Sequence, residues 1–359
     1  MSKGISVFVG MNYILEDNIK FIKSAKTFGF NNVFTSLHIP EANYKKAILD
    51  FKEIAALCKN LNMNIIADIS PRAFNYLGFD INNLKAIKDL GVSAIRIDFG
   101  FSAKEIAYFT QNPYGLKIEI NASTVTEKFL KELESYNPNY EMLQSCHNYY
   151  PRLNTGISIK TFKKKNDLLK KHNLKISAFI PSLVNKRGPI FEGLPTLEIH
   201  RFLEPQISAK ELFALGIDGV FFGDAIPTDE ELKTVGKISE NIIDIRIETF
   251  KPCSIEENII FNYIHENRPD CAEDVIRSTN SRIGLKKDDI INPNNTLERN
   301  LGFITIDNKN YLRYCGELQI CKKDLPKDER VNVVGKIIDE EIFLINYIDD
   351  ETKFRFIRK

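Results

Sequence analysis

The first 240 residues alternate between short, almost wholly apolar runs and longer segments with helical periodicity. Eight such pairs follow one another, most of them roughly 20 to 35 residues apart. The apolar runs, which we expect to be strands, are 5–9, 32–37, 64–69, 94–99, 116–120, 140–144, 175–180 and 219–223. They are rich in β-branched residues and apolar on both faces, as is typical of parallel strands buried on both sides. Eight strand–helix units in about 240 residues predict an α/β fold of the TIM-barrel type.

Glycines mark where several of the helical segments end. Gly29, Gly91 and Gly216 each follow a helical pattern and precede an apolar run, which is the usual place of a C-terminal helix cap. The main alternative, an open doubly wound sheet that binds a dinucleotide, would carry G-x-G-x-x-G directly after its first strand. The segment after residue 9 has no such motif, so we favour the barrel.

The pattern changes after about residue 244. Short runs with turn signals between them predict strands at 245–250, 301–306, 317–320, 331–338 and 341–348. A helix is expected at 254–267, with Ser254 as its N-cap and Glu257 completing a capping box. We therefore predict two domains, a TIM barrel at 1–243 and a smaller, mostly-β closed barrel at 244–359.

The charge and the cysteines disfavour several classes of protein. Lys and Arg number 49 and Asp and Glu 48, so the chain has no overall field to attract nucleic acid or an anionic membrane. No apolar run approaches the roughly 20 residues that span a bilayer, and the N-terminal segment has the pattern of a strand, not of a signal peptide. The 6 cysteines form no C-x-x-C pair, which disfavours a zinc knuckle and a disulfide scaffold. We expect a cytoplasmic protein with no nucleic-acid or membrane partner.

The active site of a TIM barrel lies at the C-terminal ends of its strands. The polar residues at or just after the ends of the predicted strands are Asp68, Arg96, Asp98, Glu119, Asn121, His147 and Asp224. Several carboxylates around one mouth suit acid/base or nucleophilic work on a glycosidic bond. Neighbouring parallel strands lie about 4.8 Å apart, so we predict Asp98 and Glu119 as the working pair and hold Asp68 and Asp224 in reserve. The alternative is that Asp98 pairs with Arg96 and that Glu119 lies below the mouth.

Two long loops after the predicted strands carry cations and aromatic side chains. The loop at 147–158 contains Tyr149 and Arg152 and ends in a Thr-Gly turn that opens a helix, where free N–H groups could hold an anion. The loop at 185–201 is longer than most connections in a compact domain, and such loops are usually functional. Its candidate ligand-binding residues are Arg187, Glu192, His200 and Arg201. Both loops predict an anionic ligand, the alternatives being a surface ion pair and a solvated connector.

Other chemistries have weaker support. A metal site could be assembled from His38, His147, His200 and Asp224, but H-x-H and H-E-x-x-H are absent. A Schiff-base lysine is disfavoured because Lys117 and Lys175 stand where strands start. We therefore predict no metal and no cofactor. In the second domain, Arg268 and Arg277 could reach an anion site or serve a domain interface, and the sequence does not separate these roles.

Five ordered segments resemble one family. They are RIDFG at 96–100, HNYYPR at 147–152, RGP at 187–189, EGLPTLE at 192–198 and RPD at 268–270. In this order the chain resembles the 6-phospho-N-acetylmuramidases of glycoside hydrolase family 170, long described as a domain of unknown function or "outer surface protein". The resemblance runs over essentially the whole chain and implies a TIM barrel followed by a cyclophilin-like β domain.

The resemblance also implies an intracellular enzyme of cell-wall (peptidoglycan) recycling. Such an enzyme cleaves the β-1,4 bond of the phosphorylated amino-sugar disaccharide N-acetylmuramic acid 6-phosphate–N-acetylglucosamine. The phosphate and the lactyl carboxylate of this substrate would match Arg152, Arg187 and Arg201, with His200 or the second-domain arginines as further candidates. Substrate-assisted catalysis stays open, with Asn121 as a contact for the acetamido group. A phosphosugar sensor without turnover and a phosphosugar isomerase or epimerase are the alternatives, and a homo-oligomer is left open.

Overall fold

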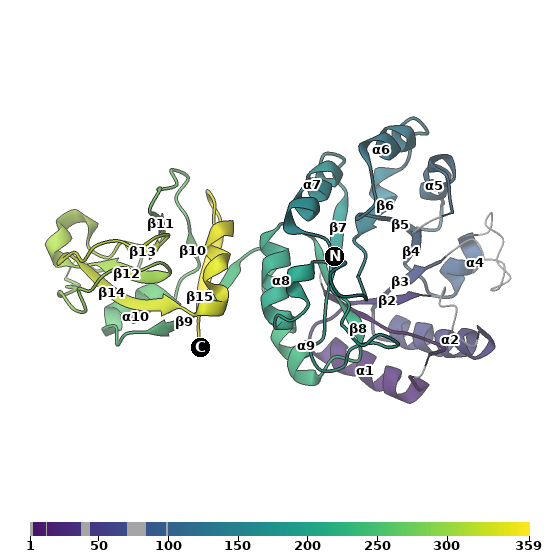
Figure 1. The fold of residues 1–359 in the computed structure, drawn as a ribbon, viewed down its shortest axis with the longest axis horizontal. Coiled ribbons are helices and arrows are strands. Elements are labelled where there is room, and N and C mark those ends of the chain that lie inside the picture. The colour runs from purple at the N-terminus through teal and green to yellow at the C-terminus, as the bar shows by residue number, and fades with distance from the viewer. Residues whose placement is uncertain (1–2, 12, 37–43, 70–83, 98–99, 287) are drawn as a thin grey trace. The chain divides into compact units, whose positions relative to one another are not determined.

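The computed structural model describes residues 3–11, 13–36, 44–69, 84–97, 100–286 and 288–359 (Figure 1). The chain forms two compact units, Met1–Ile238 and Ser239–Lys359. The first unit ends at residue 238, whereas the sequence predicts the boundary after residue 243. None of the helices in the described part of the chain combines the length and the apolar character that a membrane crossing needs.

The first unit is a closed barrel in which eight parallel strands pair in chain order and β8 returns to β1. The strands are β1 (Lys3–Ser6), β2 (Asn32–Ser36), β3 (Asn64–Asp68), β4 (Ala94–Ile97), β5 (Lys117–Asn121), β6 (Leu143–Cys146), β7 (Lys175–Ile180) and β8 (Gly219–Ala225). A helix follows each strand: α1 (Leu15–Thr27), α2 (Tyr44–Asn60), α4 (Leu84–Asp89), α5 (Ala103–Thr110), α6 (Glu127–Glu134), α7 (Ile159–Lys170), α8 (Pro205–Ala214) and α9 (Asp229–Gly236). The helices surround the strands (Figure 1). The TIM barrel predicted from the alternation is confirmed.

Local signals in the sequence set the ends of these helices. A capping box of Ser102 and Glu105 begins α5, and one of Thr228 and Glu231 begins α9. Gly91 and Gly216 have φ values of 93° and 75°, a conformation that side chains other than glycine rarely adopt. The chain therefore turns from helix to strand at the positions where the sequence predicts helix caps.

The strand register stacks two layers inside the barrel. Phe34, Ile66 and Ala94 lie side by side on β2, β3 and β4, and they pack with Phe179 and Phe221 into an apolar layer. Two residues further along the strands, the register places polar residues next to one another. This layer consists of Ser36, Asp68, Arg96, Glu119 and Gln144, one from each of β2 to β6. On β2, β3 and β4 the barrel interior therefore changes from apolar to polar toward the C-terminal ends of the strands.

The second unit is a seven-stranded sheet with the order β10-β15-β9-β14-β12-β13-β11. Its strands are β9 (Ile243–Thr249), β10 (His265–Glu266), β11 (Val275–Arg277), β12 (Phe303–Asp307), β13 (Leu318–Cys321), β14 (Val331–Ile337) and β15 (Lys353–Arg358). An antiparallel bridge between Asn267 and Ser278 links the ends of the edge strands β10 and β11. The sheet is therefore nearly closed into a barrel, which agrees with the predicted mostly-β domain.

Three details of the second unit differ from the sequence prediction. Segment 341–348 lies in a 3₁₀ helix, η4 (Asp339–Tyr347), and is not a strand. A run of apolar residues without strict alternation fits either structure, and buried Glu341 fixes this one because its carboxylate accepts hydrogen bonds from Arg246 N at 2.7 Å and Nε at 2.8 Å. The sequence analysis missed the short strands β10 and β11, and it missed β15, although Phe354 and Phe356 alternate with more exposed residues there. Helix α10 (Ser254–Phe261) is shorter than predicted, with Cys253 and Glu256 forming its capping box.

Candidate active site

The polar layer of the barrel centres on an ion pair between β4 and β5. Arg96 Nη1 lies 3.5 Å from Glu119 Oε1, and Gln144 Nε2 donates to Glu119 Oε2 at 2.7 Å. The guanidinium also donates to Cys146 O at 2.9 Å and to Asn148 Oδ1 at 2.5 Å. Arg96 therefore ties β4 to β5 and to the end of β6, which makes it a framework for the site and not an open receptor for a ligand.

Glu119 lies at the bottom of this network. Its side chain is fully buried, and Oε1 accepts no hydrogen bond from the described residues. Burial raises the pKa of its carboxyl group, although Arg96 and Gln144 oppose this. At this depth, Glu119 contacts Arg96 and Gln144 and has no exposed surface for a ligand.

Asp68 is the counterpart of Glu119 on the other side of Arg96. It ends β3, it is half-buried, and its Oδ2 accepts a hydrogen bond from Ser36 Oγ at 3.2 Å. Its partial exposure at the C-terminal end of a strand lets the carboxylate contact a ligand in the barrel mouth. Asp98, the predicted partner of Glu119, lies outside the described residues.

Arg187 brings a positive charge to the barrel mouth. Its guanidinium lies over the ring of Phe8, at 4.6 Å from the centroid, and 5.3 Å from the centroid of Tyr149. Nη1 donates to Tyr149 Oη at 3.2 Å, while the buried Nε has no hydrogen-bond partner among the described residues. Tyr149 in turn makes edge contacts with Phe34 and Phe179 of the apolar layer. A stacked guanidinium with an unused buried donor is well suited to bind an anion.

Asp224 holds the loop that carries Arg187. Its carboxylate, at the end of β8, accepts three backbone hydrogen bonds: from Arg187 N at 2.8 Å, from Ser182 N at 2.9 Å and from Leu194 N at 3.1 Å. Burial raises the pKa of this carboxyl group, and the three N–H donors oppose the shift. Because both of its oxygens accept hydrogen bonds from the loop, Asp224 positions the backbone of Arg187, and its role as a reserve acid stays a prediction.

A second ion pair joins the two long loops into one rim. Glu198 binds Arg201 with 2.7 Å from Oε1 to Nε and 2.7 Å from Oε2 to Nη2. Arg201 is fully buried and also donates to the carbonyls of Glu192, Gly193 and Arg152. Glu192 Oε2 accepts from Leu153 N at 2.8 Å, which adds a further link. Arg201 and Glu192, predicted as ligand contacts, therefore hold the loops together.

The predicted anion site at the start of α7 is filled from within the protein. Asn154 N and Gly156 N donate to the Glu198 carboxylate at 2.9 and 2.7 Å. The hydrogen bonds from Arg201, together with these two, lower the pKa of Glu198 to about 2. The cap of α7 is Ser158, three residues beyond Thr155. Arg152 is exposed, with its carbonyl accepting from Thr155 Oγ1 and Arg201 Nη2. The N–H groups that the sequence assigns to a substrate anion thus bind a carboxylate of the neighbouring loop.

His147 and His200, predicted to contact substrate, lie away from the mouth. His147 is fully buried, stacks on Phe162 of α7, and contacts Ser123 Oγ through Nδ1 at 3.0 Å and Asn166 Oδ1 through Nε2 at 2.8 Å. His200 is buried with Nε2 2.7 Å from Glu211 Oε2 on α8. Their partners on helices α7 and α8 make both residues part of the packing between strands and helices.

The surroundings of His147 predict a loss of stability in mild acid. Burial lowers its pKa to about 4, from an ordinary value near 6.5. The folded state therefore favours the neutral ring. The stability that the protein gains from keeping the ring neutral is fully present above pH 6.5 and is lost as the pH falls toward 4. We expect the barrel to lose up to about 3 kcal/mol of unfolding free energy over this range, measured by denaturant titration at pH 7 and pH 4.5. In the His147→Gln variant this pH-dependent loss should be smaller by the same amount, and an equal loss in both proteins would contradict the assignment.

The remaining predicted contacts have partners within the protein. Asn121 Oδ1 accepts from Ser123 N at 2.9 Å, and the residue lines a small hollow between β4, β5 and helices α5 and α6. In the second unit, Arg268 Nε lies 2.7 Å from Asp270 Oδ1, and Arg277 Nε lies 2.8 Å from Glu317 Oε1. Arg268 and Arg277 are thus each neutralised by a carboxylate of the same unit.

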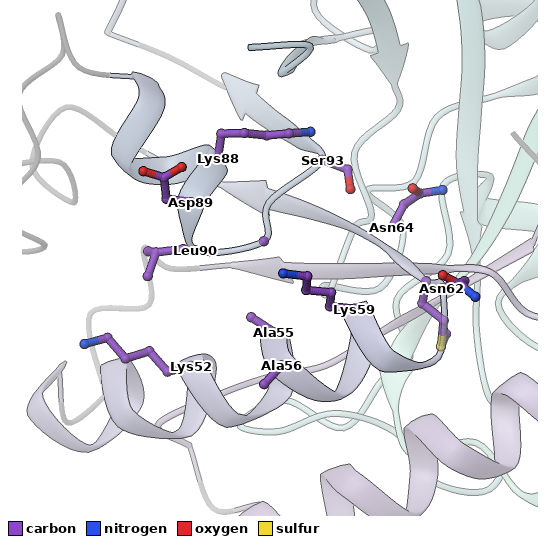
Figure 2. Close-up of a pocket in the computed structure, with 12 residues that line it drawn as sticks. Lys52, Ala55, Ala56, Lys59, Asn62, Asn64, Lys88, Asp89, Leu90 and Ser93 are labelled. Atoms are coloured by element: carbon purple, nitrogen blue, oxygen red, sulfur yellow. The ribbon is translucent and has the colours of Figure 1, made fainter.

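The structure also bears on metals and on the opposite end of the barrel. The described residues contain no group of three or more His, Cys, Asp or Glu arranged to hold a metal ion. Lys117 and Lys175 begin β5 and β7, away from the mouth. A hollow between α2 and α4 includes Asn64, at the start of β3, and Ser93, just before β4 (Figure 2). This hollow opens near the N-terminal ends of the strands, so it does not belong to the candidate active site.

Comparison with known proteins decides the family. A family model described as 6-phospho-N-acetylmuramidase, N-terminal, matches residues 3–237, and one described as 6-phospho-N-acetylmuramidase, C-terminal, matches residues 243–357. The chain belongs to the 6-phospho-N-acetylmuramidase family. The resemblance noted in the sequence is confirmed over nearly the whole chain, and the protein is a glycosidase, a hydrolase that acts on O-glycosyl bonds.

Two solved structures are similar to this member of the 6-phospho-N-acetylmuramidase family. The crystal structure of an uncharacterized B. cereus protein has a TM-score of 0.87 at 34% identity, covering 99% of each chain. That of a conserved protein of unknown function from a locus in Enterococcus faecalis has a TM-score of 0.71 at 34% identity, covering 100% of this chain and 97% of that one. No curated protein matches the chain.

The sequence analysis missed three residues that build the site of this muramidase-family barrel. Phe8 and Gln144 were not singled out because apolar and amide side chains on strands are usually core. Glu198 stands in the EGLPTLE segment, three residues before Arg201, and this i, i+3 spacing in a short helical turn was a signal for their ion pair.

Proposed function

We propose that this protein hydrolyses the β-1,4 bond of N-acetylmuramic acid 6-phosphate–N-acetylglucosamine during the recycling of cell-wall sugars in the cytoplasm. The main evidence that the substrate is anionic is Arg187, whose guanidinium lies over Phe8 and Tyr149 and whose buried Nε has no hydrogen-bond partner among the described residues. The match to both halves of the 6-phospho-N-acetylmuramidase family supports the glycosidase. The substrate carries two anions, a phosphate and a carboxylate, and Arg187 is placed to bind one of them.

Acid/base chemistry in this proposal falls to carboxylates at the barrel mouth. Asp68 is half-buried at the end of β3 and is the carboxylate we assign to contact the sugar. Asp98 remains the sequence-predicted second carboxylate. Glu119 would act through Arg96, whose guanidinium it neutralises from below, and not through contact with the substrate. Two carboxyl groups that flank the bond, one donating a proton to the leaving oxygen, are the usual apparatus of glycoside hydrolysis.

A chromogenic aryl β-glycoside of N-acetylmuramic acid tests the proposal. We expect release of the chromophore from the 6-phosphorylated substrate, little or no release from the unphosphorylated one, and no effect of a chelator on the rate. The reason is that the anion site would bind the phosphorylated sugar, while a carboxylate pair needs no metal. Equal rates for both substrates would show that the protein does not recognise the 6-phosphate of the substrate. Tight binding of the phosphosugar without any release would favour the phosphosugar sensor.

A further inference from the structure

The loop that carries Arg187 also displays an aromatic ring at the rim of the barrel mouth. Phe191 is 63% exposed, so most of its ring is accessible to a ligand. Its backbone has a φ of 59°, in the left-handed region that residues with a side chain rarely adopt. Such a conformation persists only where surrounding contacts enforce it, and these positions cluster at functional sites.

The contacts that enforce this position come from both ends of the loop. Asp224 accepts a hydrogen bond from Arg187 N through Oδ1 and one from Leu194 N through Oδ2. One buried carboxylate therefore holds the two ends of segment 187–194 together. Within the segment, Phe191 N donates to Arg187 O at 3.2 Å. The ring of Phe191 is therefore held by the same carboxylate that positions Arg187.

The ring lies close to the residue that follows Arg187. A Cβ atom placed on Gly188 would lie 2.8 Å from Phe191 Cζ and 3.3 Å from Cε1 and Cε2. Only glycine leaves room for the ring at this point. One turn of the loop thus directs a guanidinium inward, against Phe8 and Tyr149, and an aromatic ring outward beside it.

The geometry points to Phe191 as the stacking platform for the leaving-group sugar of the substrate. This inference rests on the proposed function and extends it to the part of the disaccharide that lies beyond Arg187. A pyranose in the β configuration presents a face of C–H groups, and an aromatic ring carries a negative face that attracts them. The glycone, with its anions, would lie inside the mouth against Arg187. The uncharged N-acetylglucosamine would then leave the mouth over Phe191.

Phe202 provides a matched control on the same loop system. It is 68% exposed, but its ring lies beneath Lys186, whose Nζ is 5.2 Å from the centroid. Phe191→Ala should raise the KM for the disaccharide roughly tenfold and change kcat less than twofold, because a stacked ring binds the ground state and the transition state alike. Phe191→Trp should keep the wild-type KM, and Phe202→Ala should leave both constants unchanged.

Product inhibition separates the two sugars. The inhibition constant for N-acetylglucosamine should rise roughly tenfold in Phe191→Ala, while that for N-acetylmuramic acid 6-phosphate stays within twofold. An unchanged constant for N-acetylglucosamine, or an equal rise in Phe202→Ala, would overturn the inference. If the wild-type protein does not hydrolyse the disaccharide, the proposed function fails by itself. Calorimetric binding of N-acetylglucosamine to wild-type protein and to Phe191→Ala then still decides whether Phe191 holds the sugar.

Discussion

Replacing Arg187 by alanine is expected to lower kcat/KM for the phosphorylated disaccharide by roughly 100-fold or more. Truncating one member of a desolvated charge pair costs about 2–5 kcal/mol, and every 1.4 kcal/mol is a factor of ten. The loss should lie mainly in KM, because the anion is bound both before and during bond cleavage. Steady-state kinetics with the phosphorylated disaccharide, at fixed ionic strength, measure it.

Two further variants distinguish the geometry of Arg187 from its charge. Arg187→Lys keeps the charge but loses the planar group that lies over Phe8 and Tyr149, so we expect an intermediate loss. Lys186→Ala removes the neighbouring cation of the same loop, whose ammonium lies over Phe202, and should leave kcat/KM within about threefold. Wild-type activity in Arg187→Ala would show that Arg187 does not bind the anion of the substrate. An equal loss of activity in Lys186→Ala would show that the effect comes from the overall charge of the loop.

The fold could be predicted in detail because its signals are local. Each barrel strand is a short apolar run, each helix has its own periodicity, and residues such as Ser102 or Gly216 set helix ends within a few positions of themselves. Segment 341–348 shows where this reasoning stops. Its apolar run fits a strand or a 3₁₀ helix, and the choice depends on Glu341 reaching Arg246, about a hundred residues earlier in the chain.

The candidate site was predicted less well because its contacts join distant segments. The strand ends and the loop at 185–201 are where the sequence places the candidate site, and Arg187 is among the residues it names. The depth of Glu119 depends on the register that sets it beside Arg96, and a strand's own sequence does not contain its register to a neighbour. In the same way, nothing near Gly156 indicates that its N–H is taken by Glu198.

Ion pairs within the protein, such as that of Glu198 with Arg201, reduce the number of cations at the site that are available to a ligand. The loops and strands offered four arginines, Arg96, Arg152, Arg187 and Arg201, yet Arg96 and Arg201 have carboxylate partners inside the barrel unit. Burying an unpaired charge costs free energy, and these ion pairs offset that cost. The pair of Glu198 with Arg201 also links the loops of the rim to one another. Arg152 and Arg187 are left without a carboxylate partner among the described residues; Arg152 is exposed, whereas Arg187 has a buried unused donor, so a single substitution at Arg187 should have a large effect.

Replacing Asp68 by asparagine should lower kcat roughly 10²- to 10⁴-fold while leaving KM nearly unchanged. This is the usual contribution of a positioned acid or base, and the amide keeps the shape of the side chain and can still accept from Ser36 Oγ. Asp218→Asn is the matched control. Asp218 is also half-buried and accepts a hydrogen bond from Ile176 N at 2.9 Å, but it stands just before β8 at the other end of the barrel. We expect wild-type kcat in that variant.

The same assay assigns the other two carboxylates. Asp98→Asn should match Asp68→Asn if Asp98 is the second member of the pair. Glu119→Gln should cost less than either, since its fully buried group acts through Arg96, and the loss should be accompanied by a lower thermal midpoint as the guanidinium loses its counter-charge. Near-normal kcat in Asp68→Asn together with a large loss and an unchanged thermal midpoint in Glu119→Gln would reverse these roles. The proton would then come from the carboxyl group whose pKa burial raises, and the mouth would have to open to a depth at which the structure shows no exposed surface.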